Sequence, residues 1–217
     1  MAANFRHQFI DFSLAQKVLC FGEFKTKAGR LSPYFFNAGL FHDGQSLRQL
    51  ARFYAKAIAA AGIEFDMLFG PAYKGIPLVA AVAIALAEDG RNVHYSFNRK
   101  EEKDHGEGGS VIGAPLAGRV LIVDDVISAG TSVRESVNLI RDSRAIPCGV
   151  VIALDRMERG SGELSAAQEV EQLYHMPVIS IATLDDLIGY LQMGNEMSAH
   201  LEAVNRYREQ FGVAAHA

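Results

Sequence analysis

A chain of 217 residues is long enough for one α/β domain, alone or with a small lid, and its 49% hydrophobic residues can form a real core. The net charge of −4 argues against a nucleic-acid partner, because such proteins present a basic face. Two cysteines, Cys20 and Cys148, are too few for a disulfide framework. No apolar signal region opens the chain and the longest apolar run, 76–87, is too short to span a bilayer, so we expect a cytoplasmic protein without membrane contact.

Apolar residues at helical spacing predict four helices, near residues 5–12, 47–61, 133–140 and 201–211. Short apolar runs predict strands at 66–70, 93–97, 119–124, 149–154 and 178–181. Strands that are apolar on both faces and separated by helices indicate a parallel sheet covered on both sides. The carboxyl ends of such strands meet at one edge, where ligands of open α/β sheets bind. We therefore expect the functional residues in the loops that follow the strands.

Residues 99–113 interrupt this alternation, because Arg99-Lys-Glu-Glu-Lys-Asp-His-Gly-Glu-Gly-Gly109 is polar and ends in glycines. A connection of this length is typical of a lid or a binding loop. Its basic residues Arg99, Lys100 and Lys103 are offset by acidic neighbours, so the segment taken alone also fits a solvated loop.

The strongest motif is Val120-Leu-Ile-Val-Asp-Asp-Val-Ile-Ser-Ala-Gly-Thr-Ser132. An apolar strand brings two adjacent carboxylates, Asp124 and Asp125, to the ligand edge, where buried charge requires hydroxyls, a cation or solvent. The small residues that follow open a helix and let backbone N–H groups approach an anion. The pattern therefore indicates a sugar-phosphate site, with acids for ribose hydroxyls and a hydroxyl-rich turn for the phosphate.

A plainer interpretation is that Thr131 or Ser132 only caps the helix, and Ser132 with Glu135 does fit a capping box. Capping does not require two preceding acids, so the aspartates favour the binding site. A strand that continued through Asp124 and Asp125 would point them to opposite sides. We therefore expect the two carboxylates to have different roles.

The motif at 120–132 resembles the phosphoribosyl-pyrophosphate motif of type I phosphoribosyltransferases. Four further segments resemble those of the bacterial orotate phosphoribosyltransferases. They correspond to the N-terminal orotate-binding region (21–37), the pyrophosphate loop (69–77), the catalytic loop (97–109) and the stretch whose arginine holds the orotate carboxylate (154–160). The segments follow the order of the family, and the resemblance extends over nearly the full chain. Ser128 departs from the Thr that is common in the family but keeps the hydroxyl.

The resemblance implies an α/β fold of the type I phosphoribosyltransferases, with a central, mostly parallel five-stranded sheet flanked by helices and a small hood subdomain. It implies a single domain over 1–217, with a hood formed mainly by about 1–40 and supported by the C-terminal helix, and a core over about 41–182. It further implies a non-proline cis peptide in the pyrophosphate loop. A homodimer is implied too, in which the 99–109 loop reaches into the site of the neighbouring subunit.

The activity implied is transfer of the phosphoribosyl group from 5-phospho-α-D-ribose 1-diphosphate to orotate in de novo pyrimidine biosynthesis, giving orotidine 5′-phosphate and diphosphate. The implied catalytic residues are Lys103, Asp124 and Asp125. Donor and phosphate contacts are expected from Lys27, Tyr73, Lys74, Arg99, Lys100, Lys103, His105, Asp124, Asp125, Val126, Ile127, Ser128, Ala129, Gly130, Thr131 and Ser132. Contacts with orotate are expected from Lys27, Phe35, Phe36, Ser128 and Arg156. Mg²⁺ is the implied cofactor, held mainly through substrate and water rather than by a dedicated protein cage.

Several of these residues have simpler interpretations when taken singly. Phe35 and Phe36 fit core aromatics, and Lys27 fits a solvated lysine in a variable part of its loop. Arg156 is more specific, because a guanidinium matches a carboxylate and orotate carries one.

Other functions stay open at this point. The motif at 120–132 also permits a type I phosphoribosyltransferase that uses a purine or uracil, although these bases offer no carboxylate to Arg156. A regulator that binds the donor without catalysis is disfavoured, because residues 1–20 are too short for an added DNA-binding domain. A fused decarboxylase barrel is excluded by length, and a dinucleotide-binding Rossmann protein is disfavoured because no Gly-x-Gly-x-x-Gly follows the first core strand.

Overall fold

The computed structural model describes residues 4–26, 29–100, 110–128, 130–160, 162–194 and 197–213. In chain order its elements are α1 (Phe5–Ala15), β1 (Leu19–Lys25), β2 (Leu31–Phe36), the 3-10 turn η1 (Ala38–Leu40), α2 (Gly44–Ala61), β3 (Met67–Gly70), α3 (Gly75–Glu88), β4 (His94–Asn98), β5 (Val111–Gly113), β6 (Arg119–Val123), α4 (Thr131–Asp142), β7 (Ile146–Asp155), α5 (Ala166–Tyr174), β8 (Val178–Thr183), α6 (Leu184–Gln192) and α7 (Ser198–Phe211). Within these ranges, no helix has both the length and the apolar character needed to cross a membrane.

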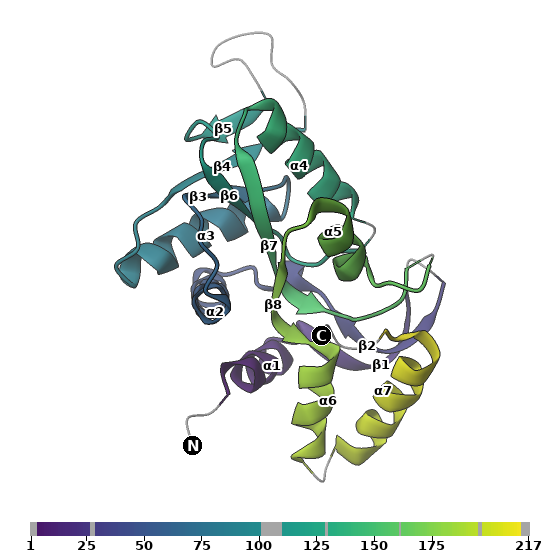
Figure 1. Cartoon of the computed structure of the whole chain (residues 1–217). Helices are drawn as coiled ribbons and strands as arrows, with labels where there is room; N and C mark the ends of the chain where they lie inside the picture. Colours follow the sequence, from purple (N-terminus) through teal and green to yellow (C-terminus); the bar gives the residue numbers. More distant parts are fainter. Residues whose placement is uncertain are drawn as a thin grey trace.

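The central sheet has the strand order β5-β4-β3-β6-β7-β8 (Figure 1). Strands β4, β3, β6, β7 and β8 all run parallel to one another. Strand β5 pairs antiparallel with β4 at one edge of the sheet. The predicted α/β fold with a mostly parallel sheet is thus confirmed. The sheet has six strands instead of the predicted five, because the short β5 lies within the segment that the sequence indicated as one long loop.

Helices cover both faces of the sheet, as the apolar strands predicted. On β6, Leu121 and Val123 pack into the cluster that contains α1, α2 and α3, whereas Val120 and Ile122 pack against α4 on the opposite face. All four side chains have no exposed surface. Because full burial of a valine, leucine or isoleucine contributes about 1.5–3 kcal/mol, this strand is a firm support for the loop that follows it.

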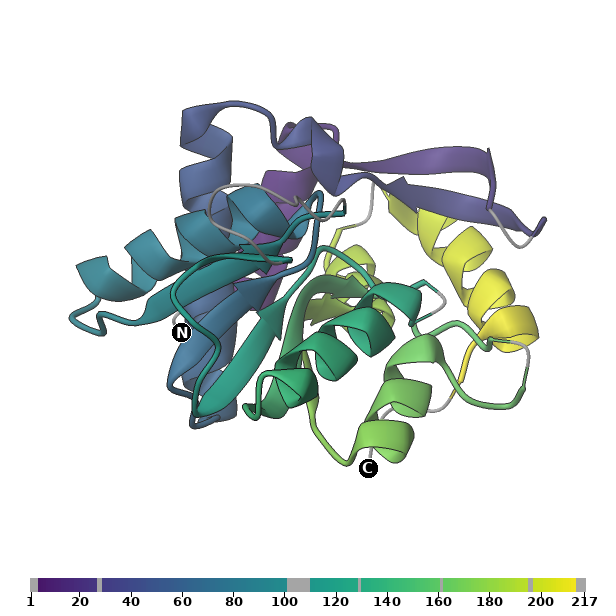
Figure 2. The same ribbon diagram turned by 90° about the horizontal axis from the view of Figure 1, so that it is seen from above.

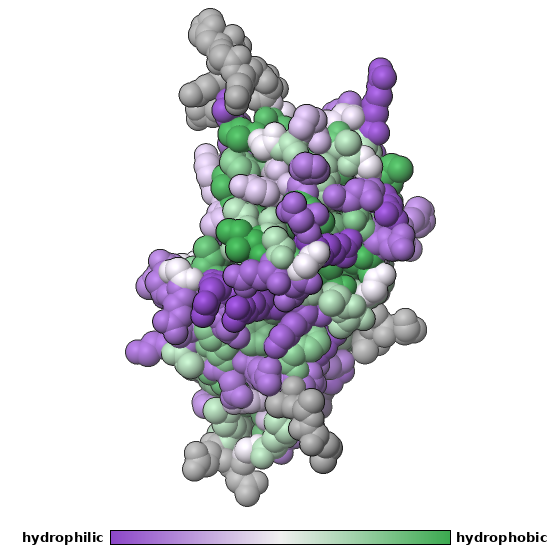
Figure 3. Space-filling model, turned by 90° about the vertical axis from the view of Figure 1, so that its left-hand side faces the viewer, coloured by the Kyte–Doolittle hydropathy of each residue, from purple (hydrophilic) through white to green (hydrophobic). Residues whose placement is uncertain are grey.

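The long helix α2 has a defined signal at each end. The Asp43 side chain accepts hydrogen bonds from the backbone N–H groups of Gln45 and Ser46, both at 2.9 Å, and Ser46 completes a capping box. At the other end Gly62 adopts a left-handed conformation with φ of 62°, which terminates the helix where the sequence predicted. The outer side of α2 and α3 exposes apolar surface between polar patches, including Ile84, whose exposed fraction is 62% (Figure 3).

A second layer lies across the carboxyl edge of the sheet. It consists of the antiparallel hairpin β1–β2, which packs against α7 from the other end of the chain (Figure 2). The contact includes the edge-to-face rings of Tyr34 and Tyr207, whose centroids are 6.3 Å apart. Phe21 of the hairpin also stacks on His200 of α7, with centroids 4.6 Å apart. The two ends of the chain therefore meet above the loops that follow the strands.

Candidate functional site

Four loops converge at the carboxyl edge of the sheet, and each carries residues that the sequence singled out. Tyr73 and Lys74 follow β3, Arg99 and Lys100 follow β4, the aspartate segment follows β6, and Arg156 follows β7. The loops touch one another: Lys74 Nζ lies 2.6 Å from Asp125 Oδ2, and Lys100 Nζ lies 5.4 Å from the centre of the Tyr73 ring. Lys27, Lys103, His105 and Ala129 lie outside the described residues.

Asp124 is buried directly beyond the end of β6, with 7% of its surface exposed. Its carboxylate accepts hydrogen bonds from the backbone N–H of Asp125 and from the Ser132 hydroxyl, both at 2.9 Å. The Tyr54 hydroxyl donates to its backbone carbonyl over 2.8 Å and thereby fixes the turn from below. Burial, reinforced by the neighbouring Asp125 charge, raises the pKa of Asp124 to about 6.

Asp125 has different partners. One carboxylate oxygen pairs with Lys74 at 2.6 Å, and the other accepts the backbone N–H of Val126 at 2.9 Å. The aspartates thus face different groups, although the alternation of a strand is not the reason, because β6 ends at Val123. Lys74 is 56% exposed and can turn to a ligand, whereas the Asp125 side chain, at 10%, is held in place.

The turn between Asp125 and α4 contains the small residues of the motif. Val126 and Ile127 are half-buried, whereas Ser128 and Thr131 are exposed. Gly130 precedes the helix with φ of 66°, and neither Thr131 nor Ser132 caps it. The capping interpretation is therefore wrong, since the Ser132 hydroxyl donates to Asp124 instead. The N–H groups of the first turn of α4, beside the exposed Thr131, are available to an anion.

The loop after β3 contains the cis peptide bond Ala72–Tyr73, which the resemblance implied. Asn98 at the end of β4 accepts the Ala72 backbone N–H at 2.7 Å and so ties this loop to the neighbouring strand. Sequence reasoning assigned no role to Asn98. A hollow of about 410 Å³ lies beside the loop and is lined by both Lys74 and Asp125.

Close backbone contact at the base of this loop leaves no room for a side chain. A Cβ on Gly70 would lie 2.2 Å from the Gly75 carbonyl oxygen and 2.7 Å from Val79 Cβ. We expect Gly70→Ala to lower the free energy of unfolding by about 2 kcal/mol or more, because the backbone must move to relieve the overlap. Denaturant unfolding measures this, with Gly44→Ala as the control, since a Cβ there meets nothing within 4 Å. Equal stability of the two variants would contradict the argument.

Of the described residues expected to contact orotate, Phe35 and Phe36 lie on β2, Ser128 lies in the turn after β6, and Arg156 follows β7. Phe35 is 47% exposed and stacks against Phe24 at 5.4 Å between centroids, so it is no core aromatic. Phe36 is half-buried and packs 6.2 Å from Phe9. The Nη2 group of Arg156 donates a hydrogen bond to the Ser32 hydroxyl over 3.0 Å. Sequence reasoning missed this partner because it is 124 residues away along the chain.

Residues 39–175 match the family of phosphoribosyl transferase domains. Together with the sheet and the aspartate motif, this match identifies the chain as a type I phosphoribosyltransferase. Orotate phosphoribosyltransferase of Thiobacillus denitrificans is 65% identical over 97% of this chain and 100% of its own length. That of Chromobacterium violaceum is 67% identical over 97% and 99%. The crystal structure of orotate phosphoribosyltransferase from Francisella tularensis has a TM-score of 0.87 at 39% identity, covering 94% of this chain and 99% of its own. The chain belongs to the orotate phosphoribosyltransferases, enzymes of pyrimidine biosynthesis.

Proposed function

We propose that this chain transfers the phosphoribosyl group from 5-phospho-α-D-ribose 1-diphosphate to orotate, forming orotidine 5′-phosphate and diphosphate. The observation that carries the proposal is the arrangement of Asp124 and Asp125 at the carboxyl edge, between Lys74 and the first turn of α4. Acids suit the hydroxyls of a ribose, and the helix start suits its 5′-phosphate. A cationic side chain opposite them suits the pyrophosphate.

The reaction asks the protein for positioning and charge stabilisation rather than for covalent chemistry. Positive charge builds on the ribose as its bond to pyrophosphate stretches, and the orotate nitrogen attacks from the opposite face. Asp124 and Asp125 hold the ribose hydroxyls and favour the cationic ring. Thr131, with the turn at 126–132, holds the 5′-phosphate. Lys74, assisted by Tyr73, Arg99, Lys100, Lys103 and His105, holds and neutralises the leaving pyrophosphate.

Orotate is held on the side of the hairpin β1–β2. Arg156 pairs with its carboxylate, and Phe35 and Phe36 offer rings and backbone groups to the pyrimidine. Ser128 offers a hydroxyl in place of the Thr that is common in the family, and Lys27 completes the set. We assign the hood to about residues 1–40 with support from α7, and the core to about 41–182, because the hairpin lies across the loops that hold the donor.

Mg²⁺ is part of this proposal as the cofactor. The carboxylate oxygens of Asp124 and Asp125 are hard donors that suit this ion, and they fit a role through water and the ribose hydroxyls. The described residues contain no group of three or more His, Cys, Asp or Glu side chains that could enclose a metal. We propose that substrate and water supply most of the ligands of the ion. When bound, the ion supplies positive charge that neutralises the pyrophosphate.

We further propose a cytoplasmic homodimer in which the 99–109 loop serves the site of the neighbouring subunit. Free thiols at Cys20 and Cys148 suit a reducing compartment. The hollow of about 270 Å³ between α2 and α3 is lined by Leu47, Ala51, Ala81, Ile84 and Ala85, with the charged Arg48 and Glu88 beside them. An apolar centre with charged neighbours suits a second copy of the chain. Closure of the loop excludes water that would otherwise hydrolyse the donor.

The loss of orotate absorbance in the presence of the donor and magnesium tests the proposal. We expect turnover with orotate, and none with hypoxanthine, adenine or uracil as controls. Turnover of a control base but not of orotate would support a different phosphoribosyltransferase. Donor binding without turnover of any base would support the non-catalytic regulator.

A further inference from the structure

Protein groups contact the Arg156 guanidinium at Nε, at Nη2 and over one face of its plane. Its Nε and Nη2 groups lie 2.8 Å and 2.5 Å from the same oxygen of Glu158. Nη2 also donates to the Ser32 hydroxyl over 3.0 Å. The guanidinium carbon lies 4.3 Å from the centre of the Tyr34 ring, which is fully buried. The plane and the direction of the guanidinium are therefore both determined by protein groups.

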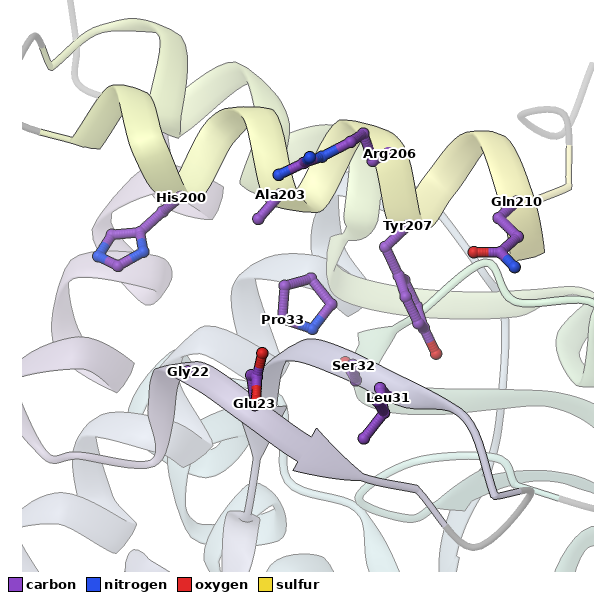
Figure 4. Close-up of a pocket in the computed structure, with 10 residues that line it drawn as sticks. All are labelled: Gly22, Glu23, Leu31, Ser32, Pro33, His200, Ala203, Arg206, Tyr207 and Gln210. Atoms are coloured by element: carbon purple, nitrogen blue, oxygen red, sulfur yellow. The ribbon is translucent and has the colours of Figure 1, made fainter.

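This arrangement leaves one part of the guanidinium available. No hydrogen bond or ion pair found among the described residues involves Nη1 of Arg156, and 23% of the side chain remains exposed, while the Tyr207 phenol lies close to both Arg156 and Glu158. A ligand carboxylate can therefore approach Nη1 without displacing Glu158 or Ser32. Figure 4 shows Ser32 on the hairpin beneath α7, with Tyr207 directed down from the helix beside it. The acceptor for Arg156 thus lies at the contact between hairpin and helix.

Glu158 is itself fixed by its backbone. Its segment forms a β-bridge with Gly212, directly after α7. The bridge is flanked by two further hydrogen bonds, from Val213 N–H to the Met157 carbonyl at 2.9 Å and from Arg159 N–H to the Phe211 carbonyl at 2.8 Å. The Glu158 side chain is only 17% exposed. Its carboxylate therefore has a defined place from which to hold Arg156.

A carboxylate beside Arg156 would be expected to oppose a ligand that is also a carboxylate. Arg30, at the base of the hairpin turn, offsets this effect: its Nη1 lies 4.0 Å from the second oxygen of Glu158. Arg30 also stacks over the ring of Phe211 at 4.9 Å. Among Arg30, Arg156 and Glu158 the net charge is one positive, which attracts an anion, and the buried Asp155 at the end of β7 is a further acid near Tyr34.

We propose that Glu158 is a positioning residue for recognition of the orotate carboxylate, acting by holding the guanidinium of Arg156 with its Nη1 edge toward the substrate. The inference rests on the proposed function and deepens it. A free arginine loses rotamer freedom when it binds, and a guanidinium held in advance loses less. Glu158 contacts Nε and Nη2 of Arg156, and Ser32 contacts Nη2. Nη1 is the nitrogen that remains for the substrate carboxylate.

The opposing effects of position and charge make the proposal testable. Glu158→Ala frees Arg156 and also removes a negative charge from beside the binding position. If only charge mattered, the KM for orotate would fall. We expect it instead to rise by about tenfold, because the loss of orientation outweighs the gain in attraction. The KM for the donor and kcat should change less than about twofold, since Glu158 touches neither the ribose nor the leaving group.

Two further variants complete the experiment. Glu158→Gln keeps an acceptor oxygen without the charge and should raise the KM for orotate by about threefold, because charge-assisted hydrogen bonds are roughly twice as strong as neutral ones. Glu163→Ala is the matched control: Glu163 is 92% exposed and lies 3.8 Å from Arg159, so its loss should leave every constant unchanged. Thermal unfolding checks that each variant is folded, and Glu158→Gln decides the matter if the alanine variant is not.

An unchanged or lowered KM for orotate in the folded Glu158 variants, with normal turnover by the wild type, would overturn this inference and leave the proposed function intact. An equal rise in the KM for orotate and for the donor would also overturn it, because that pattern reports a general disturbance. Absence of orotate turnover in the wild type would instead overturn the proposed function.

Discussion

Replacing Asp124 by Asn is expected to stabilise the folded protein at pH 8 and to reduce orotate turnover on the order of a hundredfold or more, as loss of one transition-state contact does in other enzymes. The reason for the first effect is the environment of the carboxylate. Burial and the adjacent Asp125 raise the pKa of Asp124 to about 6. The hydrogen bonds from Ser132 and from the Asp125 N–H oppose this rise but do not cancel it.

The direction of the pH dependence follows from the two pKa values. Between the unfolded value of about 3.9 and the folded value the native chain binds more protons than the unfolded one, so stability falls as pH rises through this window. Above a pH of about 6 the cost of the buried charge is fully present, and it corresponds to at most about 3 kcal/mol. Asn removes the charge and keeps an acceptor for the Asp125 N–H. We therefore expect the variant to gain about 1–2 kcal/mol at pH 8 and nothing below about pH 4.

Thermal unfolding at pH 4 and pH 8 measures this difference, and a gain of about 1–2 kcal/mol corresponds to a rise in Tm of roughly 2–8 °C for a chain of this size. Asp89→Asn, at an exposed position after α3, is the control and should change stability and turnover little. Turnover by the wild type should increase as pH rises through about 6, because in the proposed mechanism the ionised form of Asp124 stabilises the cationic ribose. An Asp124→Asn variant that is less stable than the wild type at both pH values would contradict the account.

The sequence predicts the parts of this fold that local patterns encode. The core strands were found because residues such as Ile122 and Val151 are apolar and lie on opposite faces that are both covered. The predicted helices do not include α3, α5 or α6, although α5 and α6 both have a local signal. Ser165 with Gln168 and Thr183 with Asp186 form capping boxes at their starts. Strand β5 has no such signal, because three residues, two half-buried and one exposed, are too few for a period.

In the candidate site, too, some features follow from local sequence patterns and others do not. The position of Asp124 and Asp125 follows from the strand before them, so the sequence places them at the ligand edge. The groups that hold them in place do not follow from any local pattern. Tyr54 reaches Asp124 across 70 residues, and Ser32 reaches Arg156 across 124. Only the packing of α2 under the sheet and of the hairpin against α7 creates these pairs.

The second large effect is expected at Lys103, which the resemblance implies as catalytic. The flanks of its segment are well defined: β4 and β5 pair antiparallel, and the Arg99 N–H donates to the Ser110 carbonyl over 2.8 Å. Both ends of the loop are thus held together at one place on the sheet. We expect Lys103→Ala to lower kcat on the order of a hundredfold or more while leaving thermal unfolding unchanged, because the role proposed for this lysine is to stabilise charge on the leaving pyrophosphate. Near-normal turnover would remove the loop from catalysis.

A shared site makes a sharper prediction for mixtures of inactive subunits. If Lys103 serves the partner's site, a hybrid of Lys103→Ala with Asp125→Asn contains one site with both native residues and one site with neither. Random exchange of equal amounts gives half hybrids, so the mixture should recover up to about a quarter of the wild-type activity.

The matched control for this recovery is a mixture of Asp124→Asn with Asp125→Asn. These aspartates are adjacent in the chain and serve the same site, so every site in every hybrid keeps one defect and no activity should return. Differently tagged subunits and mass measurement of the native dimer establish that exchange has occurred. If exchange has occurred and the mixture of Lys103→Ala with Asp125→Asn still recovers no activity, each subunit supplies the lysine of its own site. The loop would then close over its own site rather than over the partner's.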